Sequence, residues 1–227
     1  MDAATSSVNL SDLVVGRDVQ VPVLGGGTRR YVNLDNAAST PTLKPILEKV
    51  NEFLVWYSNV HRGTGFKSKL SSWAFDRSRE RIAEFVNADR EKQVVLFAKN
   101  TTEAINHLAQ RYPFRKNGVV MTTVMEPHSN ELPWRNVARI VHVGVLPDGR
   151  VDEDDFLMKL ENYRGRVQLV AVTGASNVTG YINPIYRYAK WAHQAGAKVF
   201  VDAAQLAPHR AIDVKPAYDP EHIDYLA

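Results

Sequence analysis

The chain has 227 residues, of which 44% are hydrophobic and 23% are charged, the balance of an ordinary soluble globular protein. It contains no cysteine, which excludes disulfides, zinc sites built on cysteine and a cysteine nucleophile within these residues. The formal charge is only +3, and acidic and basic residues are interspersed, as over 76–81. A nucleic-acid-binding surface would instead cluster its lysines and arginines, so no nucleic-acid partner is expected.

The N-terminal segment predicts an arm rather than a targeting or membrane segment. Residues 1–10 are polar and lack both a basic region and an apolar run, and no stretch reaches the length of a membrane span. We therefore expect a cytoplasmic protein without a membrane contact. Residues 1–30 are weakly patterned and end in Gly25-Gly26-Gly27, which predicts an arm over 1–30 and a domain over 31–227.

Regular patterning begins after the arm. Apolar residues at helical spacing predict helices over 41–57 and 70–86. Short apolar runs then predict strands over 94–97, 119–122, 140–145, 167–173, 198–201 and 223–226. Between them, helices are predicted over 101–112, from about 130, over 154–163 and over 184–195. This alternation predicts an α/β fold, a mostly parallel sheet with helices on both faces.

Two loops precede the first predicted strand. Small residues over 31–40 would let the backbone approach a ligand, although an ordinary entry into a helix explains them equally well. The loop over 59–65 is glycine-rich, but it lacks the spacing of a dinucleotide-binding fingerprint and follows no strand. Its Arg62 suits an anionic group.

Four predicted strands end in polar residues, and parallel sheets bind ligands beyond these ends. After the first strand, Thr101 and Thr102 open a helix whose hydroxyls and free N–H groups suit a phosphate. On this segment alone, an ordinary helix cap is the simpler interpretation. Asp202 closes the fifth strand. A carboxylate at this position has three alternative roles: to bind Mg²⁺, to pair with a cationic ring nitrogen or to cap a turn.

The other two polar ends are 126–130, which contains His128, and 176–180, which contains Asn177. Each is an ordinary turn when taken alone. Together the four ends supply an anion site, an imidazole, an amide and a carboxylate, a set that suits a flat heteroaromatic ligand with a phosphate. No metal site is predicted, and the magnesium alternative is weakened because no G-x-x-x-x-G-K-[ST] loop occurs.

Taken in order, these motifs resemble those of the class V aminotransferase and cysteine desulfurase family, which are fold type I pyridoxal-phosphate enzymes. The resemblance covers roughly 31–227. It is carried by Leu34-Asp35-Asn36-Ala37-Ala38, Asn59-Val60-His61-Arg62-Gly63, Asn100-Thr101-Thr102-Glu103-Ala104-Ile105-Asn106, Glu126-Pro127-His128-Ser129-Asn130, Ser176-Asn177-Val178-Thr179-Gly180 and Val201-Asp202-Ala203-Ala204-Gln205.

The resemblance implies a role for each matched residue. Thr101 and Thr102 would hold the phosphate of pyridoxal 5′-phosphate, and His128 would stack on the ring as a catalytic residue. Asp202 would pair with the protonated ring nitrogen, which lets the ring accept electrons from the substrate. The residues expected near the ring hydroxyl are Asn177 and Gln205. The residues expected to bind the amino-acid substrate are Asn36, Ala37, His61 and Arg62.

The chain departs from the family pattern at its end. Family members carry a Ser-x-His-Lys segment after the strand that follows the aspartate, and its lysine forms the Schiff base with the cofactor. Here the strand 223–226 is followed only by Ala227, and Lys215 lies in a context that does not match. We therefore expect a fragment, an incomplete large domain that lacks the catalytic lysine and the small C-terminal domain.

The leading hypothesis is thus a pyridoxal-phosphate-dependent enzyme acting on an amino acid, present here as a fragment. The family implies a homodimer for the full-length protein. One alternative is a non-catalytic protein that binds the cofactor or a partner. A lower-ranked alternative is a Mg²⁺-dependent nucleotide hydrolase that uses Asp202.

Overall fold

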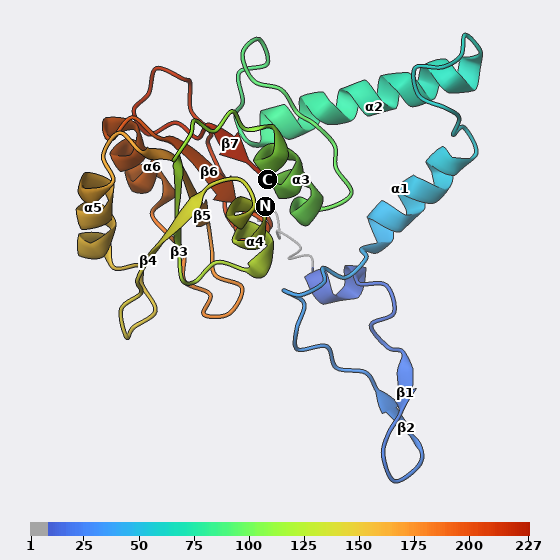
Figure 1. The fold of residues 1–227 in the computed structure, drawn as a ribbon. Coiled ribbons are helices and arrows are strands. Elements are labelled where there is room, and N and C mark those ends of the chain that lie inside the picture. The colour runs from blue at the N-terminus through green and yellow to red at the C-terminus, as the bar shows by residue number, and fades with distance from the viewer. Residues whose placement is uncertain (1–8) are drawn as a thin grey trace, which may run out of the picture. The chain divides into compact units, whose positions relative to one another are not determined.

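The structure is a computed structural model that describes residues 9–227, so the first eight residues of the predicted arm lie outside it. The chain divides into two compact units, one up to Arg77 and one over Ser78–Ala227. The division falls within helix α2 (Phe66–Phe85), which is labelled in Figure 1. The predicted division into an arm over 1–30 and a domain over 31–227 stays a prediction.

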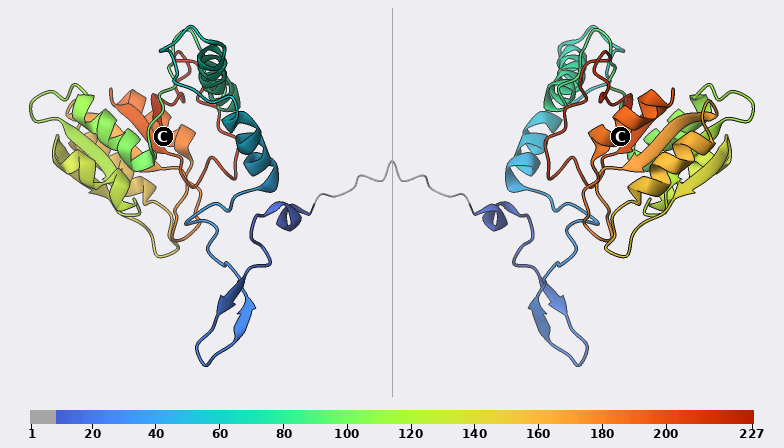
Figure 2. Two further views of the ribbon diagram at one scale, coloured as in Figure 1. Left: turned by 90° about the vertical axis from the view of Figure 1, so that its right-hand side faces the viewer. Right: turned by 90° about the vertical axis from the view of Figure 1, so that its left-hand side faces the viewer.

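The first unit contains a hairpin that the sequence pattern did not indicate. After a short 3₁₀-helix η1 (Leu10–Leu13), β1 (Gln20–Pro22) pairs antiparallel with β2 (Thr28–Arg30), drawn in blue in Figure 2. Gly25, Gly26 and Gly27 lie in its turn with φ of 93°, 94° and 83°, backbone conformations that only glycine adopts without strain.

Helix α1 (Lys44–Leu54) follows in the same unit and lies within the helix predicted over 41–57. Pro45 sits in its first turn, where the missing N–H group of proline costs no hydrogen bond. Helix α2 confirms the second predicted helix, although it begins four residues earlier than the pattern over 70–86.

The second unit is built on a parallel sheet of five strands in the order β4-β3-β5-β6-β7. The strands are β3 (Val119–Thr123), β4 (Arg139–Val143), β5 (Val167–Thr173), β6 (Lys198–Asp202) and β7 (Tyr225–Leu226). All residues of β3 and β5 are buried. Burial on both faces explains why these strands are continuous apolar runs in the sequence.

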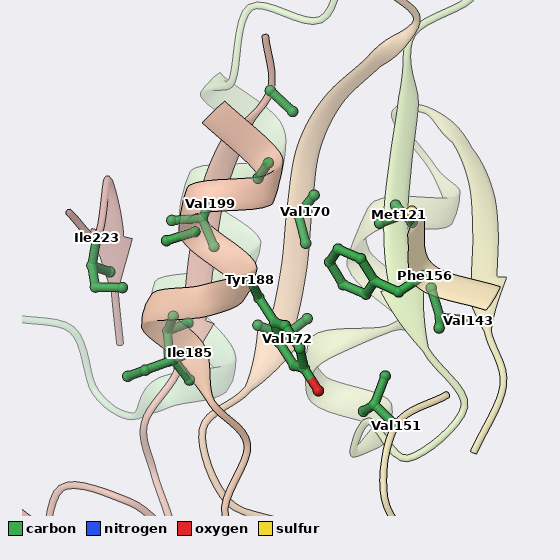
Figure 3. Packing of buried hydrophobic residues seen from close by; sticks show 14 of the residues in the cluster. Met121, Val143, Val151, Phe156, Val170, Val172, Ile185, Tyr188, Val199 and Ile223 are labelled. Atoms are coloured by element: carbon green, nitrogen blue, oxygen red, sulfur yellow. The ribbon is translucent and has the colours of Figure 1, made fainter. Parts of the chain in front are cut away.

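Helices cover both faces of this sheet (Figures 1 and 2). Helices α3 (Thr101–Arg111) and α4 (Leu132–Arg135) pack on one face, and α5 (Glu153–Asn162) and α6 (Ile185–Gln194) pack on the other. Figure 3 shows Phe156 of α5 beside Tyr188 of α6, and the two rings stack with centroids 4.9 Å apart. The predicted α/β class is confirmed.

One predicted strand is wrong. Residues 94–97 form no strand and belong to no helix, and Val94 and Leu96 are 82% and 77% exposed. An apolar run becomes a strand only when a neighbouring strand satisfies its backbone N–H and C=O groups, and no described strand pairs with this one. The predicted helix from about residue 130 is also divided, into η2 (His128–Asn130) and α4.

Among the described residues 9–227, no helix combines the length and the apolar character that crossing a membrane requires.

Candidate functional site

A pocket of about 280 Å³ lies at the carboxyl ends of β3, β5 and β6, beside the N-terminus of α3. Parallel strands all end on one edge of the sheet, so side chains that are distant in the sequence meet there. The pocket is lined by Asn100, Thr101, Thr102, Pro127, Ser129, Thr173, Ala175, Asn177, Asp202, Ala204 and Gln205. Five of the six residues predicted to bind the cofactor are among them.

The N-terminus of α3 fits both interpretations of its sequence, an ordinary helix cap and a phosphate site. Asn100 caps the helix, because its Oδ1 accepts the N–H of Glu103 at 2.9 Å. Glu103 in turn accepts the N–H of Lys99 through Oε2 at 2.6 Å. The N–H groups of Thr101 and Thr102 lie in the first turn, where no intrahelical carbonyl accepts them. A capped helix start therefore still offers N–H donors and a positive dipole end to an anion.

Asp202 ends β6 in the pocket wall and is only 2% exposed. Its Oδ1 accepts the N–H of Ala204 at 3.0 Å, and no basic side chain of the described residues forms an ion pair with it. Burial raises the pKa of this carboxyl, and the bond from Ala204 only partly opposes the shift. A cationic group brought by a ligand would restore the favoured charged form.

Glu126 is a polar residue near this site that the sequence interpretation passed over. Its Oε1 accepts the hydroxyl of Thr123 and its Oε2 accepts Nδ2 of Asn130, both at 2.7 Å. Burial of the carboxyl raises its pKa to about 7, and the charge of Asp202 adds to that shift. The sequence signal was a glutamate at a strand end, but only its burial and partners distinguish it from an ordinary turn residue.

His128 begins η2 and its residue is exposed. Its neighbours Pro127 and Ser129 line the pocket, whereas His128 itself does not. The turn after β3 thus reaches the pocket as expected, but the stacking of its imidazole on a cofactor ring stays a prediction.

The four residues predicted to bind substrate belong to the first unit, and all four are exposed. Oδ1 of Asn36 accepts Nδ2 of Asn33 at 2.8 Å. His61 has a φ of 55°, and its Nε2 lies 3.1 Å from a carboxylate oxygen of Asp76. Their role in substrate binding, with that of Ala37 and Arg62, stays a prediction.

No lysine of the described residues lines the pocket. Nζ of Lys215 lies 2.5 Å from Oε2 of Glu221 and 4.6 Å from the ring centroid of Tyr186, so this lysine is held elsewhere. The side chain of Lys99 is 85% exposed and pairs with Glu103 at 3.7 Å.

Comparison with known proteins identifies the family. The model of the family described as "Aminotransferase class-V" matches residues 32–218. The chain belongs to the class-V aminotransferase family. The resemblance predicted from the ordered motifs is therefore confirmed.

Relatives of this class-V chain include a cysteine desulfurase of Haloferax volcanii, 32% identical over 95% of this chain and 52% of its own length. A probable cysteine desulfurase of Synechocystis sp. is 39% identical over 81% of this chain and 45% of its own. The apo structure of a cysteine desulfurase from Thermococcus onnurineus NA1 superposes with a TM-score of 0.75 at 32% identity, covering 85% of this chain and 48% of that one. The chain thus spans about half the length of these relatives, and the predicted fold type is confirmed.

Proposed function

We propose that this chain binds pyridoxal 5′-phosphate in the pocket and contributes to an enzyme of the class-V aminotransferase or cysteine desulfurase type that acts on an amino acid. The observation that carries the proposal is the pairing of two features in one pocket. Asp202, a buried carboxylate without a cationic partner among the described residues, forms one wall, and the N-terminus of α3 forms another. Membership of the class-V aminotransferase family and similarity to cysteine desulfurases support the same function.

The cofactor fits the residues present. A protonated pyridine nitrogen would supply the positive charge that the Asp202 carboxylate lacks among the described residues. The phosphate would accept the first-turn N–H groups and the hydroxyls of Thr101 and Thr102 at the positive end of the helix dipole. When bound, the cofactor supplies an electron sink for substrate carbanions.

The other predicted residues would orient the cofactor and the substrate. Asn177 and Gln205 line the pocket and carry amides suited to the ring hydroxyl. Arg62 suits the carboxylate of an amino-acid substrate, because its guanidinium forms paired hydrogen bonds with such a group. For the remaining contacts with the substrate we propose Asn36, Ala37 and His61. A homodimer is the assembly that we propose for the full-length protein.

A second candidate function is cofactor binding without catalysis by this chain. It is favoured by the lining of the pocket, which among the described residues includes no lysine. The two candidates differ in covalent chemistry. Treatment with stoichiometric cofactor and then borohydride, followed by peptide mass analysis, should leave this chain without a specific adduct. A stoichiometric adduct at one lysine would rule out the binding-only function.

The decisive experiment compares pyridoxal 5′-phosphate with pyridoxal, which lacks the phosphate, by titration of the purified chain followed through tryptophan fluorescence. The double variant Thr101→Ala/Thr102→Ala should weaken binding of the phosphorylated ligand by about tenfold or more and leave pyridoxal unaffected. Asp202→Asn should weaken both ligands, since both contain the ring nitrogen.

The matched control is Asp148→Asn, which makes the same change of charge in an exposed turn where Asp148 pairs with Arg150 at 2.7 Å. This control should leave both affinities unchanged. Binding that is equal in all four proteins, or no binding of the phosphorylated ligand at millimolar concentration, would contradict the proposed function.

A further inference from the structure

Two imidazoles meet one carboxylate at the amino edge of the parallel sheet. Nε2 of His193, in the last turn of α6, lies 2.8 Å from Oδ2 of Asp224. Nε2 of His222, in the loop before β7, lies 3.2 Å from Oδ1 of the same carboxylate. The three side chains are little exposed, and each offers one atom of a type that binds metal ions, all within 4.8 Å of one another.

The other nitrogen of each imidazole fixes where the proton of the ring lies. Nδ1 of His193 lies 2.8 Å from the carbonyl oxygen of Pro220, and Nδ1 of His222 lies 2.6 Å from that of Asp219. A carbonyl oxygen only accepts hydrogen bonds, so each Nδ1 carries the proton of its ring. In a neutral imidazole Nε2 then has a lone pair, and its neighbour here is a carboxylate, which also only accepts. A positive group is therefore needed between each Nε2 and Asp224.

Protons meet this need poorly. The two imidazole rings stack with centroids 4.1 Å apart and an interplanar angle of 16°, and Nζ of Lys198 lies 2.7 Å from Oδ1 of Asp224. Protonating both rings would place three positive charges around one carboxylate, and like charges at such distances repel. A single proton would leave the second Nε2 facing an acceptor. One divalent cation would serve both nitrogens and the carboxylate at once.

We propose that His193, His222 and Asp224 form a zinc-binding site. Two imidazole nitrogens and one carboxylate oxygen, completed by water, suit zinc better than Mg²⁺ or Ca²⁺, which prefer oxygen ligands. The bonds from Nδ1 to backbone carbonyls are those that orient histidines on a metal ion. The low exposure of the ligands leaves little access for a substrate, so the ion has a structural role and joins the end of α6 to the loop before β7.

The site is independent of the proposed cofactor pocket, which lies at the opposite edge of the sheet. The sequence alone predicts no metal site, because one ligand comes from α6 and the other two from a loop that follows β6. Lys198 competes with the ion for the carboxylate of Asp224. The side chain of this lysine is 53% exposed, so its ammonium can move into solvent when zinc binds.

The test measures the zinc affinity of the purified chain, first freed of metal, by competition with a chromogenic zinc indicator. The parent protein should bind one zinc ion per chain at this site. His222→Ala should weaken binding by more than about tenfold, since losing even a hydrogen bond to a metal ligand costs about 10- to 100-fold.

The matched control is His142→Ala. Nε2 of His142 also lies near a carboxylate, 3.0 Å from Oε1 of Glu131, but this pair belongs to no group of three metal ligands in the described part of the chain. The control should leave the zinc affinity unchanged. Lys198→Gln should act in the opposite direction and strengthen zinc binding by about threefold or more, because it removes a positive charge beside the ion.

Two further measurements use the zinc complex directly. X-ray absorption at the zinc edge should show two imidazole nitrogens among the ligands of the ion, and this measurement needs no variant. Zinc should also raise the urea midpoint of the parent protein more than that of His222→Ala, because an ion that binds only the folded chain stabilises it.

Four results would overturn the inference: no zinc binding at micromolar concentration, equal zinc affinity in His222→Ala and the parent protein, weaker zinc binding in Lys198→Gln, or fewer than two imidazoles on the bound ion. None of them bears on the proposed function, which is tested by variants of the cofactor pocket.

Discussion

Asp224 precedes β7 at the amino edge of the sheet, and Asp202 ends β6 at the carboxyl edge, where the pocket lies. Both side chains are buried, but their surroundings differ. Asp224 lies 2.8 Å from Nε2 of His193 and 2.7 Å from Nζ of Lys198. Although burial opposes its ionisation, these partners hold the pKa of Asp224 at about 2. Burial raises the pKa of Asp202, whose carboxylate accepts one described hydrogen bond, from the N–H of Ala204.

This is the difference that we expect between a structural carboxylate and one that binds an organic ligand. The chain completes the surroundings of Asp224 with its own cations and with the N–H of Val199 at 2.9 Å. Asp202 lies in the wall of a pocket. Both positions are aspartates whose side chains are little exposed, so what distinguishes Asp202 is that no basic side chain of the described residues pairs with it.

The largest expected effect comes from removing each charge in turn. Asp224→Asn should lower the free energy of unfolding by about 3–5 kcal/mol at pH 7, because it leaves His193 and Lys198 without their buried partner. Asp202→Asn should lower it by less than about 1 kcal/mol or raise it, because the charged form is already disfavoured. Urea unfolding of both variants gives the comparison. Equal losses would show that the two carboxylates are equivalent in the unliganded protein.

A second prediction uses Glu126, the other carboxyl near the pocket with a raised pKa. It ionises near 4.5 in the unfolded chain and at about 7 in the folded one, so the folded state binds more protons between these values. Its contribution to stability therefore falls as the pH rises from about 4.5 to 7. Asp224 behaves oppositely, since its contribution is present above about pH 4 and is lost toward pH 2.

Glu126→Gln should accordingly raise stability by about 3 kcal/mol at pH 8 and change it little at pH 4.5. The amide can keep both bonds if the hydroxyl of Thr123 turns to accept one, because a hydroxyl both donates and accepts. Urea midpoints measured across this pH range provide the test. An identical pH dependence of stability in the variant and the parent protein would contradict the raised pKa of Glu126.

The smallest expected effect compares two helix caps, one inside the pocket and one outside. Oδ1 of Asn100 caps α3, and Oδ1 of Asp152 caps α5 by accepting the N–H of Asp155 at 3.0 Å. Replacing either by alanine should cost about 1 kcal/mol of stability. Only Asn100→Ala should also weaken binding of pyridoxal 5′-phosphate. Equal effects of the two variants on ligand affinity would show that the start of α3 does not contribute to ligand binding.

Sequence reasoning succeeded where a residue's environment follows from its place in the chain. The strand predicted over 167–173 matches β5 because strands buried on both faces are continuous apolar runs. Asn177 and Asp202 were expected at one edge of the sheet because parallel strands end there together, and both line the pocket.

It failed where the environment depends on distant partners. The run over 94–97 is as apolar as a true strand, but pairing is a property of the neighbouring chain and not of the run itself. Glu126 looked like a turn residue because its importance lies in burial and in bonds to Thr123 and Asn130. Likewise, no local pattern tells which residues of the turn after β3 line the pocket, which are Pro127 and Ser129.

The short length of β7 has a consequence for motion in the sheet. All seven residues of β5 are buried, so its amides should exchange with solvent only when the sheet as a whole opens. The two residues of β7 are only partly buried, and hydrogen bonds join Ala203 to Ala227 at 2.7 Å and Ala227 to Val201 at 3.1 Å. Detachment of this strand releases the backbone on both sides of Asp202. We therefore expect the pocket wall that carries the carboxylate to open together with β7, and a bound ligand to reduce this opening.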